Sequence, residues 1–226
     1  MIKDIVKNLS LSSTLRINEV SKELESQGKD VFKFGFGQSP FKVPENVVAE
    51  LKNNAHQNKY LPIQGLPELR EAIAQFVSSR KKYQYKAENI LVGPGTKELM
   101  FLLQILFDGE VILPSPSWVS YEPQAIIGRN KVHWVNTIRE NNWFPTAEDI
   151  EKIVLKNKNN NYLLFLNSPN NPSGQVCVNL EELSLVVKKY RGFGKSSNFK
   201  RIQKFKRFKK LNDKRYSKKF KLILNA

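Results

Sequence analysis

Short apolar runs alternate with amphipathic segments along most of this chain, and that alternation restricts the fold more than any single motif does. We expect strands at 31–34, 90–92, 111–113, 132–135 and 162–166, of which 90–92 should be buried on both faces. We expect helices at 12–27, from Pro44 to Leu51, from Pro67, from near Thr96 to Leu106, up to Ile127, and at 146–155 and 180–187. The helix from Pro67 should bury Leu69, Ile73, Phe76 and Val77. Because strand–helix–strand connections are right-handed, this order predicts an α/β fold with a mostly parallel, doubly wound sheet.

The stretch from Asn89 to Leu106 combines an expected strand, a Gly-Pro-Gly turn and an apolar helix that we expect to be largely buried. Gly93 and Gly95 allow a tight bend and the close approach of a ligand. A helix N-terminus carries free N–H groups, so Gly95, Thr96 and Lys97 have the chemistry to hold a phosphate. The alternative is an ordinary strand-to-helix connection in which Thr96 is the N-cap.

Two further turns follow expected strands: PSPSWVSY after 111–113 and NSPNNPSG after 162–166. Open parallel sheets bind ligands beyond the carboxyl ends of their strands, where these turns and GPGTKE should meet. Taken singly, Trp118 is explained as a core aromatic and Asn171 as a residue that caps a turn. Together, an aromatic plate, a phosphate cradle and an amide donor suit a flat, phosphorylated heteroaromatic ring.

The sequence from about Lys29 to Tyr190 resembles the class I and II aminotransferases, the aspartate-aminotransferase-like branch of the pyridoxal-phosphate enzymes. The segments that carry the resemblance are YLPIQGLPELREAIA, NILVGPGTKELMFL, PSPSWVSYEP and NSPNNPSG, in the family's order. The resemblance implies the large-domain fold of that family, pyridoxal 5′-phosphate as cofactor, and transfer of an amino group between an amino acid and a 2-oxo acid.

The resemblance also implies roles for individual residues. Gly95, Thr96 and Lys97 would hold the cofactor phosphate. Trp118 would stack on the pyridine ring, and Asn171 would donate a hydrogen bond to its phenolic oxygen. A stacked indole, that hydrogen bond and a neutralised phosphate together fix the ring, while the cofactor supplies the electron sink.

Two residues nearer the N-terminus receive roles from the same resemblance. Tyr60 would reach a phosphate in the neighbouring subunit, which implies a homodimer. The turn around Gly37, in GFGQSPF, would face the substrate carboxylate. From the residues alone, a plain turn is the favoured explanation of this stretch, and Tyr60 is either a core or a ligand-facing side chain.

The family's catalytic residues are not found in this sequence, so the catalytic residue is unknown. Family members place the Schiff-base lysine, the aspartate that pairs with the pyridine nitrogen and the substrate-binding arginine after the NPSG segment. No Asp-Glu-x-Tyr, Ser-Lys or Arg-x-Gly pattern of that kind follows Tyr190, and Ser217-Lys218 is a lone dipeptide in a lysine-rich run. We therefore expect an N-terminal arm and helix at 1–42, a partial cofactor-binding domain at 43–190 that is incomplete at its C-terminus, and a basic tail at 191–226 that is disordered or non-native. One hypothesis is a frameshift, which sequencing of the gene would test.

The basic charge of the protein is concentrated in its last segment. Sixteen of the 37 Lys and Arg residues, but only Asp213 of the 21 acidic residues, lie between Lys188 and Ala226, so the rest of the chain carries a net charge of +1. The aromatic residues interleaved with these cations are Phe199, Phe205, Phe208, Tyr216 and Phe220. This pattern supports an alternative function, binding of nucleic acid or an acidic surface through 188–226. Such a run is more often a solvated segment.

Other site classes find little support in the sequence. GFGKSS at 192–197 departs from the phosphate-loop pattern, which needs a glycine where Lys189 stands. His56 and His133 have no apparent carboxylate or cysteine partners, so we expect no metal site. A single cysteine, Cys177, and the lack of a long apolar run predict a cytoplasmic protein. The sequence does not identify the amino acid substrate.

Overall fold

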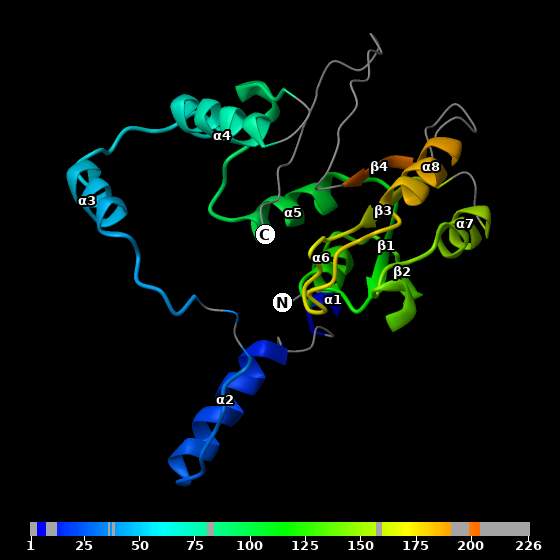
Figure 1. Ribbon diagram of the computed structural model, residues 1–226, viewed down its shortest axis with the longest axis horizontal. Helices are drawn as coiled ribbons and strands as arrows, with labels where there is room; N and C mark the ends of the chain where they lie inside the picture. The colour runs from blue at the N-terminus through cyan, green and yellow to red at the C-terminus, as the bar shows by residue number, and fades with distance from the viewer. Residues whose placement is uncertain are drawn as a thin grey trace. The chain divides into compact units, whose positions relative to one another are not determined.

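The computed structural model describes residues 4–7, 13–35, 37, 39–80, 84–156, 160–190 and 199–203 (Figure 1). Contacts divide the chain into two compact units. The larger comprises Met1–Val6 and Pro62–Ala226, and the smaller comprises Lys7–Leu61. A short helix, α1 (Asp4–Lys7), crosses the first boundary between them.

The larger unit is built on a parallel four-stranded sheet with the order β2-β1-β3-β4. Its strands are β1 (Glu110–Ser115), β2 (Val132–Asn136), β3 (Tyr162–Phe165) and β4 (Phe199–Gln203). The first three lie where the sequence predicts strands, and β4 falls in the basic tail. Because all pairs are parallel, the carboxyl ends of the strands share one edge of the sheet.

Helices cover both faces of this sheet (Figure 1). On one face, α5 (Thr96–Leu106) and α6 (Tyr121–Ile127) pack on Val111 and Leu113. On the other, α7 (Ala147–Lys156) and α8 (Leu180–Tyr190) pack around Ile112. Every residue of β3 is buried, as expected for a strand covered on both sides. These two cores confirm the predicted doubly wound α/β arrangement.

The predicted strand at 90–92 is wrong, although its residues are extended. Ile90 is buried, and its carbonyl accepts a hydrogen bond from Arg70 of α4 (Pro67–Ser79) at 3.1 Å. The N–H of Val92 donates to the carbonyl of Gln64 at 3.0 Å. A strand requires a ladder partner, and none is assigned to these residues within the described part of the chain. The segment is held by a loop and by a side chain instead, after the short 3₁₀ helix η1 (Ala87–Asn89).

The predicted burial of two helices is also only partly correct. In α5, Leu99, Met100 and Gln104 are buried, whereas Leu102, Ile105 and Leu106 are exposed, Leu106 by 74%. In α4, Val77 is buried with Ala74 and Ser78, whereas Leu69 and Phe76 are exposed. An apolar stripe indicates which residues avoid water but not how many neighbours are present to cover them.

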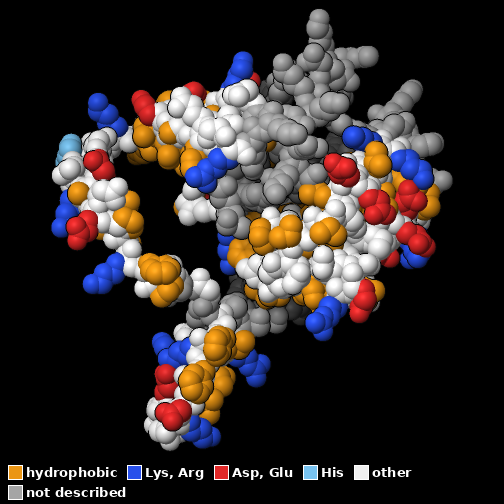
Figure 2. Space-filling view, in the orientation of Figure 1, with side chains coloured by type: hydrophobic (Ala, Val, Ile, Leu, Met, Phe, Trp, Pro, Cys, Tyr) orange, Lys and Arg blue, Asp and Glu red, His pale blue; other side chains and the backbone are white. Residues whose placement is uncertain are grey.

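The smaller unit contains α2 (Ser13–Ser26) and α3 (Glu45–Asn54). Both helices were predicted, and α3 follows Pro44 and runs three residues beyond Leu51. The predicted strand at 31–34 is wrong: Phe32 and Phe34 lie in irregular backbone and are 84% and 92% exposed. Figure 2 shows hydrophobic side chains at the surface along α2 and α3.

The remaining elements lie close to their predicted positions. The helices α6, α7 and α8 match the segments that end at Ile127 and span 146–155 and 180–187, and η2 (Arg139–Asn141) is an additional short 3₁₀ helix. No helix in the described ranges is long and apolar enough to cross a bilayer. Of 191–226, only 199–203 are described, so the GFGKSS segment, Lys218 and most of the tail aromatics lie outside the described residues.

Candidate functional site

The GPGTKE turn leads directly into the N-terminus of α5. Gly95 occupies the N-cap position with φ 158° and ψ 158°, a conformation essentially restricted to glycine. The helix begins at Thr96, so Thr96 is not its N-cap, and no side chain caps this end. A Cβ atom built on Gly95 would meet nothing within 4 Å. The first amides of α5 therefore border open space, and the first turn of an α-helix leaves such amides without helical partners.

Gly93 is required for a different reason. A Cβ atom at this position would lie 2.8 Å from Cδ2 of Leu99, which is buried in the first turns of α5. The turn therefore folds back closely onto its own helix. Gly93 permits the close packing, and Gly95 permits the backbone conformation.

Trp118 lies in the turn after β1 and begins a short series of aromatic contacts. Its ring meets Tyr121 edge to face, with centroids 5.5 Å apart. Tyr121 in turn stacks on Phe165 of β3 at 4.8 Å. Burial raises the pKa of Tyr121 above its ordinary value. These contacts connect the β1 turn, α6 and the carboxyl end of β3.

The structure brings together two of the predicted site residues, Lys97 and Trp118. The Lys97 Nζ atom lies 5.5 Å from the centre of a Trp118 ring, within the range of a cation–π contact. The buried Gln124 of α6 donates from Nε2 to the Lys97 carbonyl at 2.9 Å and accepts from Gln104 of α5 at 3.0 Å. The α5 N-terminus is therefore fixed to α6 by buried amide groups.

The NSPNNPSG turn is joined to the β1 turn through Asn170, the neighbour of the predicted Asn171. Nδ2 of Asn170 donates to the carbonyl of Pro116 at 3.2 Å and to Oγ of Ser173 at 3.0 Å. Asn170 is only 8% exposed, whereas Asn171 is exposed to solvent. The turn that carries Asn171 is thus tied to the turn that carries Trp118.

The other predicted site residues belong to the smaller unit. Tyr60 and Gly37 are both exposed there. No role was predicted for Gln124, Gln104 and Asn170 from the sequence, although two of them interrupt an apolar pattern in it. Gln124 interrupts the apolar face that Tyr121 begins on α6, and Gln104 interrupts the apolar run of α5.

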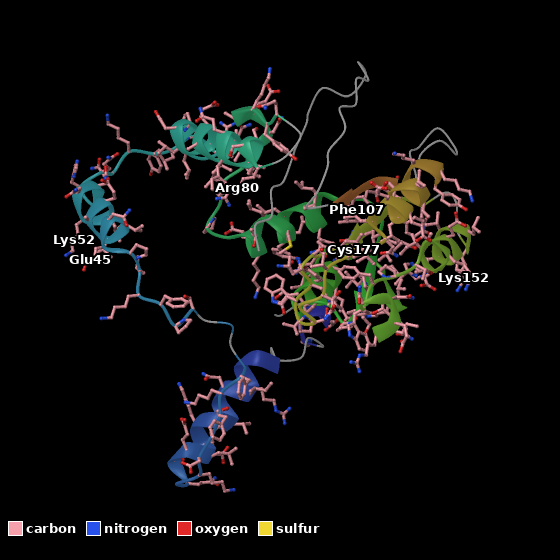
Figure 3. All side chains as sticks on the ribbon, viewed as in Figure 1. Glu45, Lys52, Arg80, Phe107, Lys152 and Cys177 are labelled. Carbon is pink, nitrogen blue, oxygen red and sulfur yellow. The ribbon has the colours of Figure 1, made fainter. Side chains whose placement is uncertain are left out.

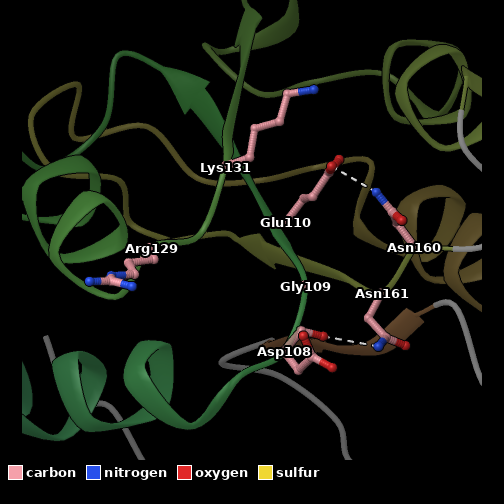
Figure 4. A pocket seen from close by; sticks show the side chains of 7 residues that line it. All are labelled: Asp108, Gly109, Glu110, Arg129, Lys131, Asn160 and Asn161. Atoms are coloured by element: carbon pink, nitrogen blue, oxygen red, sulfur yellow. Dashed lines mark hydrogen bonds between the residues drawn. The ribbon is translucent and has the colours of Figure 1, made fainter.

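A shallow pocket of about 360 Å³ lies at the opposite edge of the sheet, where the strands begin (Figure 4). Its lining residues are Asp108, Gly109, Glu110, Arg129, Lys131, Asn160 and Asn161. Asn160 donates to Glu110 at 2.7 Å, and Asn161 donates to the Asp108 carbonyl at 2.9 Å, while the Arg129 guanidinium points away from Glu110. Two hydrogen bonds therefore join lining residues of this pocket to each other.

The expectation that His133 lacks a carboxylate partner is wrong. Nε2 of His133 lies 2.5 Å from Oε2 of Glu110. His133 of β2 pairs with Ile112 of β1, and Glu110 lies two residues before Ile112, so the two side chains lie on the same face of neighbouring strands. The described residues contain no group of three or more His, Cys, Asp or Glu side chains that could hold a metal ion. Cys177 is buried within the sheet unit (Figure 3).

Comparison with known proteins gives consistent matches. Residues 29–193 match the family described as aminotransferase class I and II. The aspartate aminotransferase of Bacillus sp. (strain YM-2) is 34% identical over 193 residues, which cover 83% of this chain and 48% of the relative. The probable aspartate/prephenate aminotransferase of Aquifex aeolicus is 37% identical over 190 residues, covering 80% and 46%.

Solved structures agree with the sequence matches. The aspartate aminotransferase from Thermus thermophilus with maleate is 30% identical with a TM-score of 0.75, covering 84% of this chain and 51% of that one. The aspartate aminotransferase from Thermotoga maritima is 32% identical with a TM-score of 0.75, covering 84% and 52%. This chain spans about half the length of the relatives that it matches. By its sequence match and its fold, the chain belongs to the class I and II aminotransferase family.

Proposed function

We propose that this chain forms the cofactor-binding part of an aminotransferase that moves an amino group between an amino acid and a 2-oxo acid. Pyridoxal 5′-phosphate is the cofactor that the family implies. The observation that carries the proposal is the contact between Lys97 and Trp118 at the open N-terminus of α5. A cation, free amides and an indole lie together at the edge of the sheet where parallel α/β folds bind ligands.

The phosphate of the cofactor would be held by Gly95, Thr96 and Lys97. The open space beside Gly95 leaves room for an anion next to the amides of α5. The helix N-terminus contributes a partial positive charge, Thr96 a hydroxyl and Lys97 an ammonium group. The residues present therefore fit a phosphate monoester.

The ring of the cofactor would be held by Trp118 and Asn171. Trp118 offers an aromatic face, and the exposed amide of Asn171 offers a donor for the phenolic oxygen. When bound, the cofactor supplies the electron sink for the carbanion that forms at the substrate. The contribution of these two residues is to orient the ring and to restrict its rotation.

The proposal extends to residues whose roles come from family resemblance. Tyr60 would contribute to the phosphate site of a second subunit in a homodimer, and Gly37 would face the substrate carboxylate. The lysine that attaches to the cofactor stays unassigned. We infer the cytoplasm as the compartment from the single buried cysteine.

The binding proposal is tested with pyridoxamine 5′-phosphate, because its amine cannot react with the many lysines of this chain. Titration should quench tryptophan emission, and pyridoxamine without the phosphate should bind at least about tenfold more weakly, since a charge-assisted contact contributes roughly 1.5–3 kcal/mol. Lys97→Gln should lose most of this difference. The matched control is Lys152→Gln, an exposed lysine on the outer side of α7 (Figure 3), which should retain it. Equal affinities for the two ligands, or equal losses in the two variants, would refute the proposal.

The chemical step is tested separately with pyridoxal 5′-phosphate. An imine absorbance trapped by borohydride on one peptide would identify the attached lysine and show whether Lys218 takes this role. Labelling spread over many lysines would exclude a dedicated attachment site in this chain.

A further inference from the structure

We propose that Asn170 is a positioning residue that holds the Trp118 turn and the Asn171 turn at a fixed separation, so that both side chains can act on one ligand. The inference rests on the proposed function, which assigns roles to Trp118 and Asn171 but none to Asn170. The bond from Asn170 to Pro116 is the only side-chain hydrogen bond between these two turns among the described residues.

Asn170 lies in the turn that follows β3. Its amide reaches across from the end of β3 to the carbonyl of Pro116, which follows the last residue of β1. The parallel pairing of β1 with β3 is recorded at the start and middle of the strands, from Glu110–Tyr162 to Ile112–Leu164. Beyond these pairs β1 continues to Ser115 and β3 to Phe165, and each strand then leads into its own turn. The bond from Asn170 therefore joins them where the ladder no longer does.

Asn170 is also fixed within its own turn. Its N–H donates to the carbonyl of Gln175 at 2.8 Å, and its carbonyl accepts from the N–H of Gly174 at 2.7 Å. Ser173 Oγ accepts a second bond from the Asn170 amide. With both backbone groups bonded and the side chain 8% exposed, Asn170 has little freedom. Because Asn170 is held rigidly in the Asn171 turn, its bond to the Pro116 carbonyl also fixes the position of the Trp118 turn.

Asn170 and its partner Pro116 each lie close in sequence to one of the proposed ligand-binding side chains. Asn171 is the next residue in the chain, and Pro116 lies two residues before Trp118. Trp118 is itself only half-buried and packs on Tyr121 by one edge. A shift of the Pro116 carbonyl would therefore move the indole relative to Asn171.

The critical variant is Asn170→Asp, which keeps the shape of the side chain and can still bond Ser173, with the Ser173 hydroxyl now donating to the carboxylate instead of accepting from the amide. It removes the amide donor and places a carboxylate against the Pro116 carbonyl, so the link between the turns is lost while the backbone bonds of the turn remain. Asn170→Ala, which introduces no charge, serves as the second variant should the aspartate prevent folding.

The chain offers a matched control in Asn179. Its Nδ2 donates to the carbonyl of Pro145 at 2.9 Å, an amide-to-proline bond of the same kind in the same connection after β3. Asn179→Asp loses that bond but touches neither the Trp118 turn nor the Asn171 turn. Both aspartate variants should lose similar stability, because each loses one side-chain hydrogen bond.

The experiment uses the full chain with Trp134→Phe and Trp143→Phe, so that Trp118 is the remaining tryptophan. Asn170→Asp should shift the Trp118 emission and increase its quenching by acrylamide, whereas Asn179→Asp should leave both unchanged. Asn170→Asp should also lower the affinity for pyridoxamine 5′-phosphate about three- to tenfold, as expected for one lost positioning hydrogen bond.

The outcomes separate this inference from the proposed function. If the parent chain binds no pyridoxamine 5′-phosphate, the proposed function fails, and the emission of Trp118 still decides whether Asn170 positions it. If both aspartate variants change the emission equally, or if Asn170→Asp changes neither emission nor affinity, Asn170 is not a positioning residue.

Discussion

At the scale of single residues, Gly95 and Gly93 are both needed at the entrance to α5, for separate reasons. Gly95 has the unusual backbone angles and open surroundings, whereas Gly93 has the close neighbour. A side chain at Gly95 would be strained by the backbone conformation alone, whereas a side chain at Gly93 would be crowded by a neighbouring residue.

Gly95→Ala should lower the free energy of unfolding by about 1–3 kcal/mol, because alanine is strained at φ 158° even though the Cβ meets no atom. Urea denaturation measures the change. Gly37→Ala is the control, because a Cβ at that exposed position also meets nothing within 4 Å and its φ lies outside the range that disfavours side chains. A loss in Gly95→Ala no larger than in Gly37→Ala would contradict the assigned strain.

The raised pKa of Tyr162 predicts that the fold loses stability at high pH. Burial, and then the charge of Glu110, raise the pKa of Tyr162 from 10.0 to about 12 in the folded state. The unfolded chain therefore releases this proton first, so the contribution of Tyr162 to the free energy of unfolding should be constant below pH 10 and fall as the pH rises toward 12. The full contribution is about 2–3 kcal/mol.

The Tyr162 prediction is checked by urea denaturation between pH 8 and 12 in the parent and in Tyr162→Phe. The fall should be shallower in the variant. Tyr121 also has a raised pKa and contributes in the same direction, so the comparison between the two proteins is the test. Parallel curves would show that Tyr162 ionises alike in the folded and unfolded chains.

At the scale of secondary-structure elements, α5 and α6 are joined by a buried pair of amides. Gln104 is fully buried, and its Oε1 atom has no hydrogen-bond partner in the structure. Gln124 is its only side-chain partner given among the described residues. Gln124 also donates to the Lys97 carbonyl, so the two amides link the contact between α5 and α6 to the candidate phosphate site.

Gln124→Leu should cost about 1–3 kcal/mol, because it leaves the buried amide of Gln104 with one weak bond, to the Met100 carbonyl at 3.4 Å. The double variant Gln104→Leu with Gln124→Leu should be less destabilised than the sum of the single variants, because both polar groups are then removed together. Urea denaturation of all four proteins completes the cycle. Additive losses would show that the two amides do not depend on each other.

At the scale of the whole molecule, many large apolar side chains are exposed. They include the α5 residues Leu102, Ile105 and Leu106 and, in the other unit, Phe32, Phe34 and Phe41. Exposed apolar side chains that gather on one element favour association. This chain spans about half the length of the relatives that it matches.

The chain should therefore bind a hydrophobic dye and self-associate in sedimentation experiments. Leu102→Gln with Leu106→Gln should reduce both signals at little cost in stability, because these side chains are already in water. Leu99→Gln is the contrasting variant, since Leu99 is buried and its replacement should destabilise the fold by several kcal/mol. A monomer that binds no dye and unfolds cooperatively would contradict this prediction.

The sequence alone determined the α/β class, three of the strands and the start of nearly every longer helix, because apolar period, proline and glycine act locally. Four sequence segments, three of them at turns, also predicted membership of the family. Whether Ile90–Val92 and 31–34 become strands depends on a partner strand, which local sequence does not contain. The exposure of Leu106 and the roles of Gln124 and Asn170 depend on which segments meet in space, so only the tertiary structure could decide them.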